Sequence, residues 1–413
     1  MKKFYYYGLM LGFVFGSLVF TACGDDDENE DGPQQEQPQR PDQPDQPDQP
    51  GGDDNNLTFS ALKFEKLPDM NVARRGHALI ATANGDVVAV GGHTTGFQLT
   101  KTAERLNGDK WVSVGINNPH DGAANIALPD GRVLICGGMG SALGVGQIAA
   151  CDIYDPAAHS FSPTGSMKTA RAFCAGVPTG DGNTVLLSGN WYNSDTTFEL
   201  WDGSAWTAFG KKDVQLNNPF VANAGNGIVY VFGCRSNYGQ LQKVVVWKVN
   251  TKDKTAEKVE NTGLEDYELY HGDYFNSLTT VDGSYICLGA KEKVIHLLRF
   301  DTKTAKATSI ATLPDAIPDV TNDIQYSSGI LLNPSRNEAY IIGAYQAKQG
   351  KALIVINYNL EKRKMTVYHG GQFDGFLHWG AWALKSDGKI VVTGGSVKDN
   401  YDPIKSAIVV TPF

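Results

Sequence analysis

The sequence predicts an all-β fold, a β-propeller of seven four-stranded antiparallel blades, from three observations. A turn followed by a short β-rich run that ends in glycine recurs seven times. The copies are roughly 45 to 55 residues apart, which is the period of four-stranded propeller repeats. Strand-like runs lie on both sides of each copy. The copies are GDVVAVGG (85–92), DGRVLICGG (130–138), DGNTVLLSG (181–189), NGIVYVFG (226–233), DGSYICLG (282–289), RNEAYIIG (336–343) and DGKIVVTGG (387–395).

Each unit is expected to begin with a two-stranded hairpin. Asp-Gly and Asn-Gly between apolar runs are strong hairpin signals, because glycine tolerates positive φ. The run before the turn, such as HALIATA at 77–83, supplies the first strand, and the run after the turn supplies the second. The third strand often carries an aromatic residue, as in TFELWDG at 197–203. The fourth strand often carries an aromatic residue as well, as in KWVSVG at 110–115. The four strands together are expected to form one blade.

The last blade is expected to be closed by the beginning of the propeller segment. The seventh unit stops after its third strand, SAIVVTPF at 406–413. LTFSALKFEKL at 57–67 precedes the first unit and is predicted to be the missing fourth strand. The two ends would then share one blade and leave no free edge between blades. The propeller is therefore expected to occupy residues 57–413.

The first 22 residues are predicted to be a lipoprotein signal peptide. Lys2 and Lys3 precede an apolar stretch that is near the lower limit for spanning a bilayer, and small residues follow it. Phe20-Thr21-Ala22-Cys23 resembles a bacterial lipobox in which Phe replaces the usual Leu. The resemblance implies cleavage before Cys23 and lipidation of its thiol. The alternative is an ordinary signal peptide followed by a chance cysteine.

Residues 23–56 are predicted to be a lipidated cysteine and a disordered tether. The segment is rich in Asp, Gln and Pro and lacks apolar periodicity, so it cannot bury enough surface to offset its ordering entropy. The acidic run after Cys23 resembles the surface-export signal of Bacteroidetes lipoproteins. That resemblance implies an outer-membrane location, on the cell surface. A solvated spacer on the periplasmic side is the alternative.

Charge and composition exclude several classes of function. Residues 24–56 carry a net charge of −11 and Lys2 and Lys3 add +2, so the whole-chain charge of −9 leaves residues 57–413 close to neutral, and no basic field indicates a nucleic-acid partner. The chain has no phosphate-binding loop, HExxH or GxSxG motif. Its six cysteines show no CxxC spacing, and Cys136 and Cys287 lie inside apolar runs. No metal and no cofactor are predicted.

Several units resemble kelch repeats. In the first unit the matching residues are Arg74-Arg75-Gly76-His77, Gly91-Gly92, the segment 102–106 and Trp111. The third unit matches through Glu199, Trp201-Asp202 and Trp206, whereas the fourth to sixth units have lost the double glycine. The resemblance implies a propeller like the central domain of galactose oxidase. It says little about function, because kelch propellers include oxidases, epimerases, lyase-like enzymes and pure binding proteins.

One face of the disc is expected to carry the functional residues. In every hairpin, the first strand begins at the same end at which the second strand ends in glycine. Residues just before the first strand and just after the glycine are therefore expected to gather around the axis. We call this end the glycine face and the opposite end the turn face. His159 and His296 fall outside the glycine face and are expected to be structural. The candidate binding residues on the glycine face are Arg75, His93, Arg171, Asn190, Trp191, Tyr192, Arg235, Tyr238, His271, Tyr274, Tyr326, Tyr345, His378 and Trp379.

Aromatic side chains with amide and charged neighbours suit carbohydrate, because flat rings stack on the apolar faces of pyranoses. The sequence therefore favours a surface lipoprotein that captures polysaccharide or host glycan for uptake. Whether the protein is an enzyme stays open. A polysaccharide lyase would use a His or Tyr acid–base group with Arg on the same face, and the candidates are His77, His93, His271 and Tyr274. A protein-binding propeller is the third possibility. A copper oxidase would need a cysteine linked to tyrosine, and Cys234 has no assignable Tyr partner.

Overall fold

The computed structural model describes residues 57–141, 146–180, 184–189, 196–214, 216–234, 244–269, 282–318, 324–347, 350–372, 379–396 and 402–413. The chain divides into two compact units, Met1–Gly51 and Gly52–Phe413, and all described residues belong to the second. β-strands build this unit, and the described ranges contain no α-helix. In the same ranges, no helix is long and apolar enough to cross a membrane.

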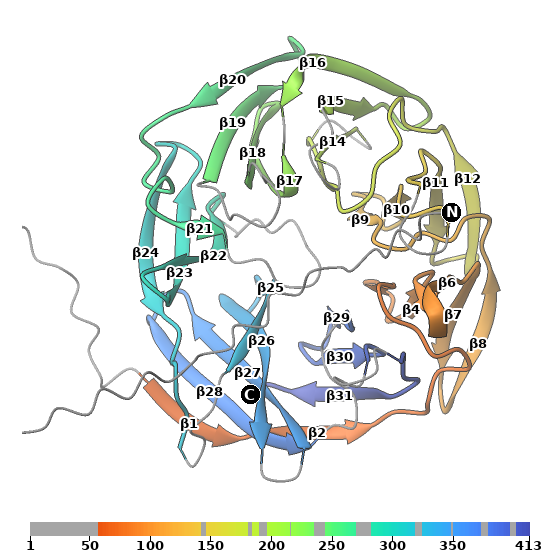
Figure 1. Ribbon diagram of the computed structural model, residues 1–413, viewed down its shortest axis with the longest axis vertical. Helices are drawn as coiled ribbons and strands as arrows, with labels where there is room; N and C mark the ends of the chain where they lie inside the picture. Colours follow the sequence, from red (N-terminus) through yellow and green to blue (C-terminus); the bar gives the residue numbers. More distant parts are fainter. Residues whose placement is uncertain are drawn as a thin grey trace, which may run out of the picture. The chain divides into compact units, whose positions relative to one another are not determined.

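The unit is a seven-bladed β-propeller, as the sequence predicts. Its sheets surround a common axis, and the first strand of each blade lies nearest that axis (Figure 1). Blade 1 consists of β3 (Ala78–Ala81), β4 (Val87–Val90), β7 (Thr102–Asn107) and β8 (Lys110–Gly115). Blade 2 consists of β9 (Ala124–Ala127), β10 (Val133–Cys136), β11 (Cys151–Asp155) and β12 (Ser160–Thr164). Blade 3 consists of β13 (Ala175–Pro178), β14 (Val185–Ser188), β15 (Thr196–Trp201) and β16 (Trp206–Val214).

The remaining blades repeat this order. Blade 4 consists of β17 (Asn217–Gly225), β18 (Ile228–Cys234), β19 (Val244–Asn250) and β20 (Thr255–Val259). Blade 5 consists of β21 (Glu268–Leu269), β22 (Tyr285–Lys291), β23 (Val294–Asp301) and β24 (Lys306–Thr312). Blade 6 contains β25 (Gln325–Asn333), β26 (Glu338–Ala347), β27 (Gly350–Asn359) and β28 (Lys364–Gln372). Blade 7 contains β29 (Ala381–Leu384), β30 (Ile390–Thr393), β31 (Ala407–Thr411) and β2 (Lys63–Lys66).

The second strands are mostly apolar because both of their faces are covered. In β4, Val88 and Val90 pack in the cluster shared with blade 2, whereas Val87 and Ala89 pack in the cluster shared with blade 7. Alternate side chains of a strand point to opposite faces, so a blade between two neighbours needs apolar residues at every position. Seven such clusters occur among the described residues, one at each junction between blades, and the last joins blade 7 to blade 1.

The segment predicted to be one closing strand is divided between two blades. β2 pairs antiparallel with β31 of blade 7, but β1 (Leu57–Ala61) pairs in parallel with β28 at the outer edge of blade 6. Leu62, between the two strands, enters the apolar cluster at the junction of blades 6 and 7, and its amide donates to the carbonyl of His369 at 2.8 Å. Leu62 is thus buried at the point where the segment passes from blade 6 to blade 7.

Candidate functional site

Backbone hydrogen bonds join the residues that precede the first strands. The amide of Gly76 in blade 1 donates to the carbonyl of Trp379 in blade 7, at 2.8 Å. Gly122 of blade 2 then donates to Gly76, and Phe173 of blade 3 donates to Gly122. All four residues have positive φ, between 52° and 67°. Phe173 and Trp379 therefore hold bulky side chains in a left-handed conformation that normally favours glycine, and such strain often accompanies functional sites.

Buried ion pairs fasten the same segments within blades 1 to 3. Arg74 donates to Glu104 on the third strand, at 2.7 Å, and to the carbonyl of Gly91, at 2.8 Å. Both charged side chains are at most 1% exposed. Blades 2 and 3 repeat the arrangement with His120, Asp152 and Gly137, and with Arg171, Glu199 and Gly189. Arg171, a predicted binding residue, is thus enclosed in its own blade, where its contacts are structural.

His120 bridges a carbonyl and a carboxylate in blade 2. Its two ring nitrogens face the carbonyl of Gly137 and the carboxylate of Asp152, each at 2.8 Å. Burial alone would raise the pKa of Asp152, but the hydrogen bonds from His120, Asn118 and Asn117 outweigh it, and the pKa is lowered. His120 thus occupies the place that Arg74 and Arg171 have in blades 1 and 3.

The double glycine of blade 1 brings two chain segments into direct contact. A Cβ on Gly92 would lie 2.5 Å from the carbonyl oxygen of Arg75, and a Cβ on Gly91 would overlap that of Pro119 in blade 2. Directly after the glycines, His93 and Arg75 exchange backbone hydrogen bonds of 2.9 and 3.1 Å. Glycine is needed at both positions because no side chain fits between the segments, and His93 is thereby fixed beside Arg75.

A polar triad with an aromatic cover lies at this point of the glycine face. Arg75 Nε donates to His93 Nε2 at 2.8 Å, and His93 Nδ1 lies 3.0 Å from a carboxylate oxygen of Asp121 in blade 2. Because arginine only donates, His93 accepts through Nε2 and carries its hydrogen on Nδ1. Phe97 and Trp379 cover the Arg75 guanidinium, with ring centroids 4.7 and 4.8 Å away, and His93 stacks on Phe97.

Phe97 is presented by a small hairpin that follows the double glycine. β5 (His93–Thr94) and β6 (Gln98–Leu99) pair with each other, and the short 3-10 turn η2 (Thr95–Phe97) joins them. Phe97 has a φ of 58° and is 38% exposed, whereas Arg75 and His93 are each 2% exposed. A ligand at this face would therefore contact the aromatic cover first, above a triad that holds the rings in place.

An axial cavity of about 50 Å³ adjoins the triad. Gly76, Gly122 and Gly380 line its wall together with Phe173 and Trp382, so blades 7, 1, 2 and 3 all contribute. A space of this size holds a few water molecules.

His77 also lines the cavity, but it is held as a neutral ring at the junction of blades 7 and 1. It is 3% exposed, and its Nε2 lies 2.9 Å from the Thr393 hydroxyl. Burial, followed by the charge of Arg74, lowers the pKa of His77 well below its usual value. This predicted catalytic candidate is enclosed by protein atoms and stays uncharged near neutral pH.

Tyr326 and Tyr345, both predicted binding residues, belong to the apolar cluster between blades 5 and 6. They are 6% and 4% exposed, and the Tyr326 hydroxyl donates to the carbonyl of Pro314. The structure does not bring them to the triad. The predicted candidates Asn190, Trp191, Tyr192, Arg235, Tyr238, His271, Tyr274 and His378 lie outside the described residues, as does Cys23.

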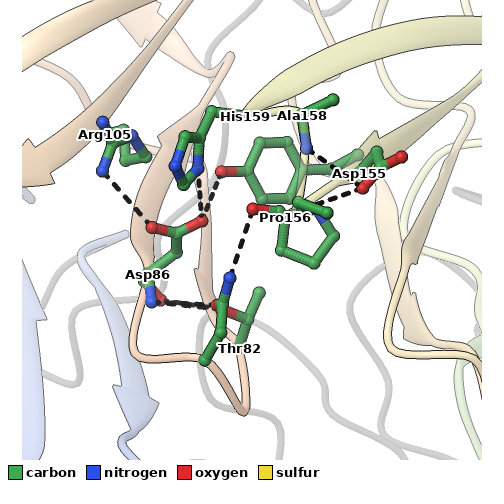
Figure 2. A network of polar contacts seen from close by, with 10 residues as sticks. Thr82, Asp86, Arg105, Asp155, Pro156, Ala158 and His159 are labelled. Carbon is green, nitrogen blue, oxygen red and sulfur yellow. Dashed lines mark hydrogen bonds and ion pairs between the residues drawn. The ribbon is translucent and has the colours of Figure 1, made fainter.

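The turn face carries a separate polar network between blades 1 and 2. Figure 2 shows His159 and Arg105 pointing at the carboxylate of Asp86 from two sides. The Tyr154 hydroxyl donates to the same carboxylate at 2.9 Å, and the Asp86 amide donates to the Thr82 hydroxyl. Asp86 belongs to the hairpin turn, so this network joins the two blades at the end opposite the triad.

The sequence pattern did not identify Phe97 or assign a role to Asp121. The signal for Phe97 is an aromatic residue beside a glycine in TTGFQLT, in a connection that follows a double glycine. Within the described residues, no cluster of three or more His, Cys, Asp or Glu side chains is arranged to hold a metal ion. Fold and site together define a seven-bladed propeller with an aromatic-covered polar triad on one face. Comparisons with models of protein families and with curated proteins found no match.

Proposed function

We propose that this protein is a lipoprotein of the bacterial cell surface whose propeller binds carbohydrate at the glycine face. The observation that carries the proposal is the pair of rings, Phe97 and Trp379, held around Arg75 beside an exposed surface. Rings fixed in this way stack on the apolar faces of pyranose sugars, and neighbouring polar groups bond the hydroxyls. The kelch-like motifs, the lipobox at Cys23 and the acidic tether support the wider description as a tethered surface receptor.

The contacts of the two described histidine candidates favour binding over catalysis. His93 uses both ring nitrogens inside the protein, on Arg75 and Asp121. His77 is buried, and its pKa is lowered well below the usual value because burial disfavours its charged form. A general acid or base must reach the proton that it transfers. Both side chains are therefore better suited to holding neighbouring residues of the glycine face in place than to transferring protons.

The test is a glycan array with purified full-length protein and two ring-deleting variants. Trp379→Gly and Phe97→Gly are suitable because both residues have positive φ, and glycine occupies the position equivalent to Trp379 in blades 1 and 2. Each variant thus removes a ring and keeps the backbone. We expect each to weaken binding of the array hit by about tenfold, the loss of roughly 1.4 kcal/mol of stacking.

Phe59→Ala supplies the matched control. Phe59 is 39% exposed, close to the 38% of Phe97, but it lies on β1 at the outer edge of blade 6. Its removal should leave binding unchanged. The proposal fails if the parent protein binds no glycan on a broad array, or if both ring-deleting variants bind as tightly as the parent.

A further inference from the structure

Three buried cysteines meet where blade 2 packs against blade 3. Cys136 ends β10, Cys151 begins β11, and Cys174 immediately precedes β13. All three belong to the apolar cluster at this junction and are at most 5% exposed. In the structure they are free thiols. Neither the polar triad nor its aromatic cover includes them.

Cys136 and Cys151 are directly opposite each other in the antiparallel pair of β10 and β11. The amide of Gly137 donates to the carbonyl of Ala150 at 2.9 Å, so the cysteines occupy the adjacent pair without hydrogen bonds. Residues in such a pair have Cα atoms about 4.5 Å apart and side chains on the same face. Disulfides span Cα separations of about 4.4 to 6.8 Å, so the backbone already permits a bond here.

Cys174 is placed differently. It belongs to blade 3, and its Sγ lies 4.0 Å from the backbone carbonyl of Cys136. A bond from Cys174 to either of the other cysteines would have to cross the junction between two blades. Cys136 and Cys151, in contrast, lie on neighbouring strands of one sheet, so a bond between them does not have to cross to blade 3.

The folded protein protects these thiols from reaction. Burial, followed by the contact with Cys151, raises the pKa of Cys136 well above its usual value. Burial also raises the pKa of Cys174 to about 12. Because the thiolate is the reactive form, enclosed thiols of this kind react slowly. Oxidation would therefore occur during folding, before blade 3 covers blade 2.

We propose that Cys136 and Cys151 form a cross-strand disulfide when the chain folds in the presence of a disulfide oxidant, either a small-molecule disulfide or a thiol–disulfide oxidoreductase. One cysteine thiolate attacks the oxidant, breaks its S–S bond and releases one thiol. The other cysteine then attacks the mixed disulfide, forms the S–S bond of the protein and releases the second thiol. Two electrons and two protons pass from the cysteine pair to the oxidant.

The bond would close the connection 137–150 at its base. In that connection, the Met139 amide donates to the carbonyl of Asp121 at 2.7 Å, and Asp121 is the residue that pairs with His93. The disulfide would thus restrain the chain segment that adjoins the polar triad. This inference does not depend on what the glycine face binds.

The test is refolding of the full-length protein from guanidinium chloride in mixed oxidised and reduced glutathione. Thiols are then alkylated under denaturing conditions and the protein is digested with trypsin. One tryptic peptide, residues 133–168, contains both cysteines and no other. We expect it to be unalkylated and lighter than its dithiol form by two hydrogens. We also expect the oxidised protein to melt a few degrees above protein refolded with a reductant.

Cys287 provides an internal control, because it is buried in the separate cluster of blades 4 and 5 and should be alkylated in the same sample. Cys174→Ser should leave the disulfide intact. Two alkyl groups on peptide 133–168 of the refolded protein would overturn the proposal. A cross-link from this peptide to the one that contains Cys174 would do the same. Both readings come from the parent protein, so they do not require any variant to fold.

Discussion

At the residue scale, His120 and His77 lie in different polar surroundings. The His120 ring bridges the carbonyl of Gly137 and the carboxylate of Asp152. His77 is held neutral, because burial and the nearby charge of Arg74 lower its pKa. The difference comes from the partner that each ring meets: a carboxylate at His120, and only the Thr393 hydroxyl at His77. Neither role is visible in the residue type alone.

The lowered pKa of His77 makes stability depend on pH. Below a pH of about 6.5 the unfolded chain binds a proton at this ring, whereas the folded protein does not. The contribution of the neutral His77 ring to the unfolding free energy is therefore complete above that pH. It is lost as the pH falls further, by up to about 1.4 kcal/mol per pH unit. We expect His77→Gln to reduce the slope of unfolding free energy between neutral pH and pH about 5.

Urea unfolding at a series of pH values measures this slope. Thr393→Val is the matched comparison, because it removes the hydroxyl partner and keeps the buried ring. It should lower stability at every pH and retain the parent slope. An unchanged slope in His77→Gln would show that the ring takes up its proton without cost in the folded state.

At the element scale, the ion pairs of blades 1 to 3 join the residues before the first strand to the third strand. Glu104 and Glu199 also accept two backbone amides each, from residues 71 and 72 and from 168 and 169. In blade 2 the shorter Asp152 is reached by the side chains of Asn117 and Asn118. The same arrangement is therefore built from Arg and Glu in blades 1 and 3, and from His, Asp and Asn in blade 2.

Breaking one of these pairs should be costly. In Arg171→Met, Glu199 stays buried without its counter-charge, and we expect a loss of about 3 to 5 kcal/mol in unfolding free energy. Arg132→Met removes an exposed pair with Asp130, both about one-third exposed, and should cost about 0 to 1 kcal/mol. Equal effects of the two substitutions in denaturant unfolding would contradict the structural role given to Arg171.

The sequence predicted the blades well and the glycine face only in part. Turn dipeptides and continuous apolar runs define hairpins locally, so the strands around each Asp-Gly could be placed. Tyr326 and Tyr345 were assigned to the glycine face because the predicted strands stopped short of them. Instead, β25 and β26 continue through Tyr326 and Tyr345, and both side chains pack in the apolar core. The triad could not be predicted, because it depends on a tight hairpin with left-handed residues and on Asp121 from the next blade.

At the scale of the whole molecule, the last blade is completed by strands distant in sequence. β2 and β31 pair with each other, while β1 only extends the outer edge of blade 6 and is mostly exposed. Removing residues 57–61 should therefore change the melting temperature little. Extending the deletion to residue 66 also removes Leu62 and β2, leaves blade 7 with three strands and should lower the melting temperature strongly.

Thermal unfolding of the two truncated proteins, followed by circular dichroism, measures the difference. Retention of Leu62 in the shorter deletion is the internal control, since it keeps the apolar cluster between blades 6 and 7. Similar melting of both truncated proteins, at the temperature of the parent, would mean that β2 does not hold the ring together.

The pairing of β2 with β31 also sets an order for biosynthesis. β2 is translated before any complete blade, whereas β31 follows all the strands of blades 1 to 6 in the sequence. Until β31 is made, β2 has no partner in blade 7 and the ring stays open. A chain that stops before β31 would therefore remain open and exposed to proteases or aggregation.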